Sequence, residues 1–472
     1  MNARKILGYA LGPVGSAAFG LVSLPLISWY FPADDIGRIV FLQTVSGLII
    51  LVLGLGLDQA YIRDYYEADN KASLFKSLAT LPFLLVTLGS AAIAWWNPAW
   101  PSGLVFDLAD GTLGLLFLLF LSTALFARFL SLILRMQEKA FAFSISQLIP
   151  KFFILAFVLL FVALGLPKNT FGLVVSYTAA QFVTVMILVY QTRRELKSAA
   201  QVPWSKESYD KALRYGLPLA FGNLAYWGFT SVDRFVLKEM ASLEELGIYS
   251  MAVNFGAVAL IFQSIFSTIW APMVFKWVKD NENLDKIGHI AVSMTVLISA
   301  IVCIVGIFSP VVTWILPPKY EPVQFILLSS LLFPLFYTLT EVSGIGLNVI
   351  KKTWVITVIN FLCLAVNLTL LRFLVPALGA KGAAIASAVS FCVFFIIKTE
   401  LSSKLWQQMP RLKLYTNAVF CLAVCIGYTY FGTRSNYFIF ALIWAAGLAG
   451  LVFFHKNQLS AALNTVKNRL KK

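Results

Sequence analysis

Charge, cysteine and histidine are all scarce in this 472-residue sequence. Only 12% of the residues are charged, whereas 59% are hydrophobic. A soluble domain needs more polar surface than this balance supplies, so a soluble fold is excluded. The polar segments between the hydrophobic runs are short, which leaves no room for a soluble catalytic domain.

The five cysteines all fall inside apolar runs, and none forms a Cys-x-x-Cys pair. Neither a disulfide framework nor a zinc site is therefore predicted. His289 and His455 lie at the edges of apolar runs, without other ligand residues beside them. We expect no metal site and no bound cofactor.

Long hydrophobic runs are what the sequence has instead. Runs of about 18 or more residues recur along the chain, and each can cross a hydrocarbon core of about 30 Å as a helix. The first run, 6–31, is too long for the core of a cleavable signal peptide. About fourteen membrane spans are predicted, at 6–31, 37–60, 74–96, 113–135, 143–165, 171–192, 209–231, 247–274, 287–308, 323–348, 354–376, 380–400, 415–432 and 437–455.

The positive charge follows the predicted spans. The net charge of +15 would suit an anionic partner, but most Lys and Arg residues fall in the loops on the side that holds both termini. This distribution obeys the positive-inside rule. It predicts a multi-pass protein of the cell inner membrane with both termini in the cytoplasm, and it removes the need for a nucleic-acid partner.

Two basic segments are expected at the cytoplasmic membrane surface. Residues 193–208 form a linker, in which Trp204 would anchor among the lipid headgroups. Residues 456–472 place aliphatic side chains on one helical face among basic residues, which is typical of a helix lying on anionic lipids.

The two halves of the chain resemble each other at an offset of about 210 residues. The turn Asp34-Asp35-Ile36-Gly37 corresponds to Glu244-Glu245-Leu246-Gly247, and further matches follow in the same order. Because each copy holds six spans, both copies insert with the same orientation, which predicts a parallel repeat. Transporters built in this way place the substrate at the interface between their halves and rock one half against the other.

The repeat predicts an all-α polytopic membrane protein with a helix pair outside the repeat. Its parts are an N-terminal six-helix lobe (1–192), a cytoplasmic linker (193–208), a C-terminal six-helix lobe (209–400), helices 13 and 14 (401–455) and a basic amphipathic tail (456–472).

Two ionisable residues stand well inside predicted spans, where charge is costly and marks function by default. They are Arg128 and Glu341, which occupy the same place in the two repeats with opposite charges. One interpretation is that they pair with each other, or bond to neighbouring polar groups, as static contacts between helices. The other is a polar cavity in which Arg128 attracts a phosphate, while Glu341 titrates or binds a coupling ion, H⁺ or Na⁺.

Polar and aromatic residues near these charges complete the candidate site. Amides offer donors and acceptors to sugar hydroxyls and aromatic rings offer flat apolar surfaces, although both also fasten helices together. Gly54 and Gly56, just before Asp58, form the best hinge candidate. The further cavity candidates are Asn223, Tyr226, Trp227, Asp233, Arg234, Tyr337, Asn348, Asn360 and Asn367.

A family resemblance is carried by Ser231-Val232-Asp233-Arg234-Phe235-Val236-Leu237, followed by Glu245-Leu246-Gly247-Ile248-Tyr249-Ser250-Met251-Ala252. These strings resemble the polysaccharide-transport branch of the multidrug/oligosaccharidyl-lipid/polysaccharide (MOP) exporter superfamily. The first-half counterpart, Phe31-Pro32-Ala33-Asp34-Asp35-Ile36-Gly37-Arg38, is similar to the matching segment of those proteins. Within that branch, the chain most resembles the O-antigen flippases of the Wzx type.

This resemblance implies a cargo and partners. The cargo would be an undecaprenyl-diphosphate-linked oligosaccharide unit moved from the inner to the outer leaflet, and Arg128 best fits the family's cationic cavity. The implied partners are membrane lipids, the lipid-linked glycan, a polysaccharide polymerase and a chain-length regulator. Lipid II flippases, which are related, carry charged residues in their first span, whereas this chain has none between Ile6 and Phe31. The difference argues against a peptidoglycan precursor as cargo.

Two alternatives stay open. A cation-coupled multidrug exporter of the same superfamily would bind lipophilic cations, which Arg128 would repel, and exporters of that branch usually have twelve spans. A membrane enzyme that transfers or polymerises glycans would need paired acids in a long loop, and Asp107 with Asp110 make a poor site. We therefore expect a transporter without catalytic residues.

Overall fold

The computed structural model describes residues 3–454, with side chains described at residues 12 and 14–453. Within this range it contains eighteen α-helices and one 3₁₀-helix, so the predicted all-α membrane fold is confirmed. Ten of the helices described are long and apolar enough to cross a membrane, and the count of fourteen spans stays a prediction. The predicted tail, 456–472, lies outside the described residues.

Packing divides the chain into two compact units. Unit 1 comprises Met1–Lys238 and Ser242–Gly247, and unit 2 comprises Glu239–Ala241 and Ile248–Lys472. The predicted lobes follow the internal repeat and change over at 193–208, whereas packing places most of helix α10 (Lys206–Met240) with unit 1. The division into lobes by repeat stays a prediction.

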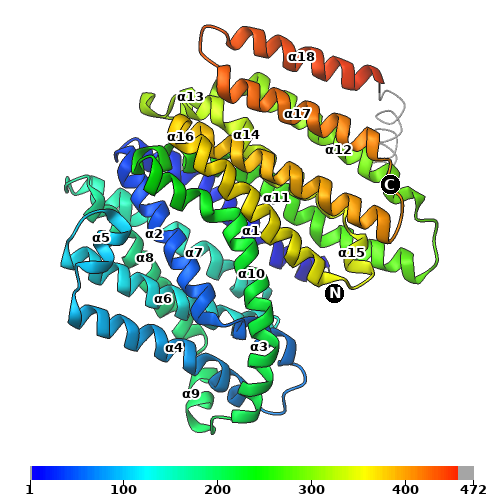
Figure 1. Cartoon of the computed structure of the whole chain (residues 1–472). Coiled ribbons are helices and arrows are strands. Elements are labelled where there is room, and N and C mark those ends of the chain that lie inside the picture. Colours follow the sequence, from blue (N-terminus) through cyan, green and yellow to red (C-terminus); the bar gives the residue numbers. More distant parts are fainter. Residues whose placement is uncertain (1–2, 455–472) are drawn as a thin grey trace. The chain divides into compact units, whose positions relative to one another are not determined.

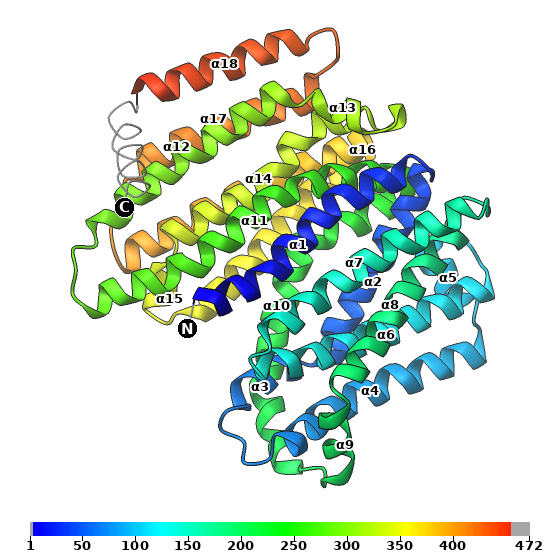
Figure 2. The same ribbon diagram turned by 180° about the vertical axis from the view of Figure 1, so that it is seen from behind.

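Unit 1 is built on five long helices that pack in series. Helix α7 packs against α1 and α8, and α6 packs against α8 and α4 (Figures 1 and 2). Asn70, Asp110 and Asn169 precede α4, α6 and α8, and their side chains accept backbone N–H groups of the first turns. The helices of this unit before α10 are α1 (Ala3–Ser28), α2 (Ala33–Gly54), α3 (Leu57–Asp64), α4 (Lys71–Trp96), α5 (Trp100–Phe106), α6 (Gly111–Met136), α7 (Ala140–Ala163), α8 (Thr170–Gln191) and α9 (Arg193–Gln201).

The predicted linker consists of helix α9 and the segment 202–205, here called the strap, which is hydrogen-bonded to α4. After α9, the Lys76 ammonium donates to the carbonyl of Val202 at 2.7 Å. The indole N–H of Trp204 donates to the carbonyl of Ser77 at 3.2 Å, so this predicted headgroup anchor has a partner inside the protein. The linker therefore belongs to the packing of unit 1.

Unit 2 is centred on α14, which packs against α12, α16 and α17, while α18 packs on α12 (Figures 1 and 2). All five cysteines lie buried in the helices of this unit with free thiols. The helices that follow α10 are α11 (Leu243–Lys279), α12 (Asp285–Phe308), α13 (Val311–Ile315), the 3₁₀-helix η1 (Pro318–Tyr320), α14 (Val323–Ser343), α15 (Gly346–Val349), α16 (Thr353–Leu405), α17 (Arg411–Phe431) and α18 (Tyr437–Phe454).

Helix α16 holds two predicted spans in one run of 53 residues. Gly379, between the predicted spans 354–376 and 380–400, has φ 53° and ψ −129°. Only glycine adopts this conformation readily. The short predicted turn is therefore a sharp kink.

The two turns related by the repeat cross each other in unit 1 at a pair of corresponding glycines. A Cβ added to Gly37 would lie 1.9 Å from the carbonyl oxygen of Leu243, and one added to Gly247 would lie 2.1 Å from the carbonyl oxygen of Ala33. Neither position has room for a side chain. The Gly that ends each repeated motif is thus required for close backbone approach.

Replacing Gly37 with Ala should destabilise unit 1, because the added methyl group forces two backbones apart. We expect a loss of about 1–3 kcal/mol in the free energy of unfolding, measured as a lower thermal midpoint of the purified protein. Gly89→Ala is the matched control, since no atom lies within 4 Å of its added Cβ. Equal midpoints for the two variants would contradict the close crossing.

Candidate functional site

Unit 1 contains an open cavity of about 720 Å³, here called the Arg128 cavity, whose lining mixes polar and apolar side chains. Helices α2, α3, α6, α7, α8 and α10 all contribute to its wall. Four of the predicted site residues, Arg128, Asn223, Tyr226 and Trp227, lie in it together. The complete lining is Gly47, Ile50, Leu51, Gln59, Ala124, Ala127, Arg128, Ser131, Ser146, Gln147, Pro150, Gln181, Thr184, Leu188, Asn223, Tyr226, Trp227 and Thr230.

The predicted hinge positions the partner of Arg128. Helix α2 ends at Gly54, and both Leu55 (φ 50°) and Gly56 (φ 70°) adopt the left-handed conformation. The turn requires glycine at position 56, because a Cβ there would lie 2.1 Å from the carbonyl oxygen of Gly216 in α10. Helix α3 then begins, with Asp58 in its first turn.

Asp58 and Arg128 form an ion pair at the edge of the cavity. Oδ2 of Asp58 accepts Nη2 of Arg128 at 2.5 Å and Nε at 3.1 Å, and it also accepts the Gln59 amide at 3.1 Å. The Asp58 side chain is 8% exposed, whereas that of Arg128 is 46% exposed. Asp58 therefore orients a guanidinium whose remaining N–H groups face the cavity.

Sequence reasoning missed Asp58 as a site residue. It stands near the end of predicted span 37–60 and directly follows the hinge glycines, so an acidic residue inside a span was the available signal. The ion pair also lowers the positive charge of the cavity, because the carboxylate of Asp58 offsets the guanidinium of Arg128. The cavity is polar rather than strongly cationic.

Amides and aromatic rings make up much of the remaining wall. Asn223, Tyr226 and Trp227 follow one another along α10, with Thr230 one turn further on. Sequence reasoning missed the three glutamines that face them, because uncharged Gln residues inside spans were not considered as ligands. These are Gln59, Gln147 and Gln181.

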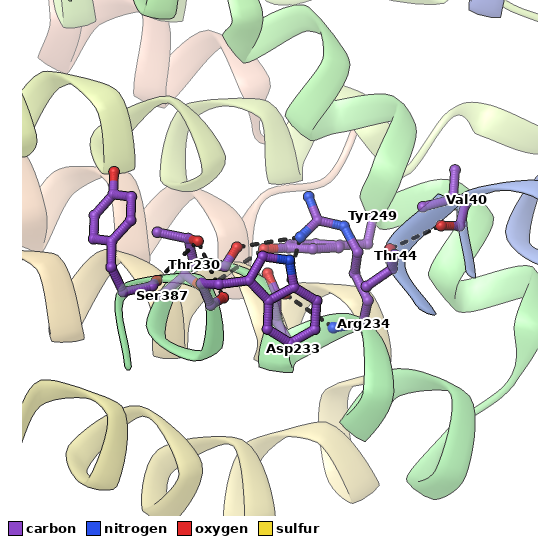
Figure 3. Close-up of polar contacts among 9 residues, drawn as sticks. Val40, Thr44, Thr230, Asp233, Arg234, Tyr249 and Ser387 are labelled. Atoms are coloured by element: carbon purple, nitrogen blue, oxygen red, sulfur yellow. Dashed lines mark hydrogen bonds and ion pairs between the residues drawn. The ribbon is translucent and has the colours of Figure 1, made fainter. Parts of the chain in front are cut away.

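Asp233 and Arg234 follow Thr230, a residue of the cavity wall, along α10, and Figure 3 shows the contacts among them. The Arg234 guanidinium donates to the carbonyl of Thr230 at 3.2 Å and lies 3.5 Å from Asp233 Oδ1. Asp233 is buried and Arg234 is 19% exposed at its side chain. Neither residue lines the Arg128 cavity, so a binding role for them stays a prediction.

Glu341 lies in a second polar cluster, within unit 2. Its carboxylate accepts a hydrogen bond from the Ser267 hydroxyl, and its carbonyl accepts the Trp270 indole N–H at 3.2 Å. The buried ammonium of Lys398 attracts it electrostatically. A Cβ on Gly344 would lie 2.8 Å from Lys398 Cγ, so this glycine makes room for the lysine stem.

Arg128 and Glu341 thus each have partners within their own unit. A static pair between the two is not needed to satisfy either charge, and the alternative that Glu341 carries a coupling ion stays a prediction. Lys398 was missed by sequence reasoning, as was Lys151 inside predicted span 143–165. Lys151 has no hydrogen-bond or ion-pair partner among the side chains that the structure describes.

The remaining candidates in unit 2 occupy different environments. Tyr337 stacks on Phe394 with ring centroids 6.2 Å apart, and Asn367 accepts a hydrogen bond from Ser390 at 3.3 Å. Asn360 is buried, and its Oδ1 has no hydrogen-bond partner within the described part of the chain. Asn348 is exposed. Their role in binding stays a prediction.

The polar cavity within an all-helical membrane fold fits a transporter, and sequence comparison decides the family. The model of the polysaccharide biosynthesis protein family matches residues 3–278, more than half of the chain. The chain belongs to this family. A comparison with curated proteins found no match.

This member of the family has the fold of solved MOP-superfamily transporters, as predicted. It is similar to the lipid II flippase MurJ in an inward closed conformation, with a TM-score of 0.69 and 14% identity over 96% of this chain and 99% of that chain. It is also similar to a multidrug resistance MATE family transporter of the MOP superfamily. The inward-facing conformation gives a TM-score of 0.56 and 16% identity over 88% of this chain and 99% of that chain.

The outward-facing conformation gives a TM-score of 0.53 and 16% identity, over 87% of this chain and 94% of that chain. These proteins are a flippase and transporters, which agrees with the expectation of a chain without catalytic residues. At such identities the likeness concerns the fold, so the substrate must be argued from the cavity.

A double-mutant cycle should measure the bond between Asp58 and Arg128. We expect Asp58→Asn and Arg128→Gln to be coupled by about 1–3 kcal/mol in the free energy of unfolding, because the carboxylate is buried. The cycle on Glu67 and Lys211 is the control, since that pair is 3.8 Å apart and both side chains are well exposed. It should give about 0.5 kcal/mol or less. Additive effects of the first two substitutions would refute the ion pair.

Proposed function

We propose that the chain is a flippase for lipid-linked oligosaccharides. It would carry an undecaprenyl-diphosphate-linked repeat unit of a surface polysaccharide such as O-antigen from the cytoplasmic to the periplasmic leaflet. The observation that supports this most is the composition of the Arg128 cavity, where one arginine stands among amides, hydroxyls and two aromatic rings. Membership of the polysaccharide biosynthesis protein family agrees with such a cargo.

The cavity offers complementary chemistry to each part of the cargo headgroup. Arg128 uses two of its five N–H groups on Asp58, so three can bind phosphate oxygens. The amides of Gln147, Gln181 and Asn223 can donate to and accept from sugar hydroxyls. Tyr226 and Trp227 offer flat apolar faces to sugar rings. The polyprenyl tail needs no polar path and can stay in hydrocarbon.

The orientation and mechanism belong to the same proposal. Both termini would lie on the cytoplasmic side of the inner membrane, as the distribution of Lys and Arg predicts. Alternating access would present the cavity first to the inner and then to the outer leaflet. A coupling ion, H⁺ or Na⁺, would act at Glu341, and a polysaccharide polymerase with a chain-length regulator would receive the product.

A multidrug exporter is the second candidate, because the fold is also that of a MATE family transporter. Lipophilic cations need an acidic cavity with an accessible carboxylate. Here the guanidinium of Arg128 faces the cavity, and Asp58 is buried and engaged by three donors. The cavity therefore favours an anionic headgroup.

Arg128→Gln should abolish display of the surface glycan in cells that depend on this chain. The substitution removes the phosphate-binding charge, and we expect a loss of at least about tenfold with protein level and membrane insertion unchanged. Arg372→Gln is the control, because Arg372 is an exposed arginine of α16 without a partner in the described part of the chain. Normal display in Arg128→Gln cells would remove Arg128 from the mechanism.

Exchanging the charges of Arg128 and Glu341 tests the interpretation that these two residues form a direct ion pair. We expect Arg128→Glu combined with Glu341→Arg to stay inactive, because Asp58 would then face a second carboxylate. Restored glycan display would instead indicate a direct pair between the two positions. Dye efflux that rises on expression, with no effect on surface polysaccharide, would favour the drug exporter.

A further inference from the structure

A second cavity of unit 1 lies outside the Arg128 cavity, at the point where the linker helix α9 meets α3, α4 and α6. Its volume is about 250 Å³, and we call it the Glu195 pocket. No residue lines both cavities. Its lining residues are Tyr61, Tyr65, Lys71, Ala72, Phe75, Ile133, Gln137, Arg194, Glu195 and Ser198.

Glu195 and Gln137 line the Glu195 pocket, and we call this pair its floor; each carries a buried oxygen atom that lacks a donor in the described part of the chain. Glu195 Oε1 accepts the amide of Gln137 at 2.6 Å. Its other oxygen, Oε2, and Oε1 of Gln137 are buried and have no hydrogen-bond partner among the residues described. Leaving a carboxylate oxygen buried without a donor is unfavourable. The floor therefore calls for a group that brings N–H or O–H donors.

Aromatic rings surround this floor. Tyr61 packs edge-to-face on Tyr65 and on Phe75, with centroids 5.5 Å and 5.8 Å apart and planes 70° and 75° from parallel. Because the rings are not parallel, they cannot sandwich a planar ligand such as a nucleobase. Their faces attract a compact cation instead. Burial raises the pKa of Tyr61 and of Tyr65, so both phenols stay neutral.

The mouth of the pocket has the opposite charge. Lys71 and Arg194 are exposed there, and Lys71 and Ala72 belong to the first turn of α4, a helix of 26 residues. The positive end of the helix dipole adds to the two cationic side chains. The Lys71 ammonium lies 4.9 Å from the Tyr65 ring centroid, and no ion pair joins it to Glu195. The mouth thus suits an anion.

We propose that the Glu195 pocket binds a phosphoethanolamine group. Its primary ammonium would donate to Glu195 and Gln137 on the floor, and its phosphate would meet Lys71 and Arg194 at the mouth. A primary ammonium brings three N–H donors to the unpartnered oxygens, whereas a quaternary ammonium brings none. Two sources carry this chemistry, the headgroup of phosphatidylethanolamine and a soluble phosphoethanolamine ester.

Occupancy would act on the linker. The ligand would join α9 to α3, α4 and α6, and the strap that follows α9 is already hydrogen-bonded to α4 through Lys76 and Trp204. The bound group would therefore fix the segment that precedes α10, which lines the Arg128 cavity. This inference stands apart from the proposed cargo, and it can hold or fail independently of the glycan display experiment.

The test is binding of glycerophosphoethanolamine to the purified full-length protein, with glycerophosphocholine and inorganic phosphate as comparison probes. Glycerophosphoethanolamine should bind at least about tenfold more tightly than either, because only it satisfies both ends of the pocket. Glu195→Gln should weaken its binding by at least about tenfold. Glu207→Gln, at an exposed glutamate of α10, is the matched control and should bind as the unaltered protein does.

Lys71→Gln gives a second reading at an exposed position if Glu195→Gln fails to fold. It should weaken glycerophosphoethanolamine binding without lowering the thermal midpoint. Inorganic phosphate binding as tightly as glycerophosphoethanolamine would reduce the pocket to a simple anion site and overturn the proposal. Equal binding of glycerophosphocholine, or no binding of glycerophosphoethanolamine, would overturn it as well.

Nanodiscs distinguish the two sources. Native mass spectrometry should show phosphatidylethanolamine retained over phosphatidylcholine by the unaltered protein, and this preference should be lost in Glu195→Gln. Binding of glycerophosphoethanolamine without lipid retention would support the proposed chemistry and assign it to a soluble ester.

Discussion

The bond between Asp58 and Arg128 joins α3 to α6 at the edge of the Arg128 cavity. A carboxylate that is 8% exposed inside a membrane protein needs a strong partner, and the guanidinium supplies two N–H groups to one oxygen. To make this bond, α2 has to end at Gly54 and the chain has to turn through two left-handed residues. The same turn presses Gly56 against Gly216 of α10. The ion pair therefore orients the guanidinium beside the turn where α3 begins and where α10 approaches most closely.

The two units handle buried charge in different ways. In unit 1 the cation faces a cavity and the anion is hidden behind it, so a ligand meets donors. In unit 2 the anion Glu341 is held by Ser267 and the cation Lys398 is buried beside phenylalanine, with its Nζ 5.4 Å from the Phe394 ring centroid. Arg128 and Glu341, which the sequence places at corresponding positions, thus lie in an open donor site and in a cluster of buried side chains.

Much of the fold could be predicted, because hydropathy and glycine placement act locally. Apolar runs predicted the helices, and Gly54 with Gly56 predicted a break that the left-handed Leu55 and Gly56 confirm. The boundary predicted between spans 354–376 and 380–400 coincides with the kink at Gly379. Arg128, Asn223, Tyr226 and Trp227 could be predicted as site residues because each is a polar or aromatic side chain inside a predicted span. The structure places these four in one cavity. Asp58 carried a similar signal, an acidic side chain inside a predicted span, and was overlooked, whereas Gln147 and Gln181 could not be assigned in this way. Their importance depends on which helix faces which, and helical spacing within one segment does not contain that information.

The crossing of Gly37 and Gly247 has a consequence for how the protein is made. Unit 1 is not a continuous stretch of chain, since it includes Ser242–Gly247, which the ribosome adds after α10. Until residue 247 has emerged, the backbone between Ala33 and Gly37 lacks the surface it packs against. A chain cut between the two sequence repeats would therefore leave the first copy without its last contact. The motifs at 34–37 and 244–247 are similar in sequence, yet the first can complete its packing only after the second has been synthesised.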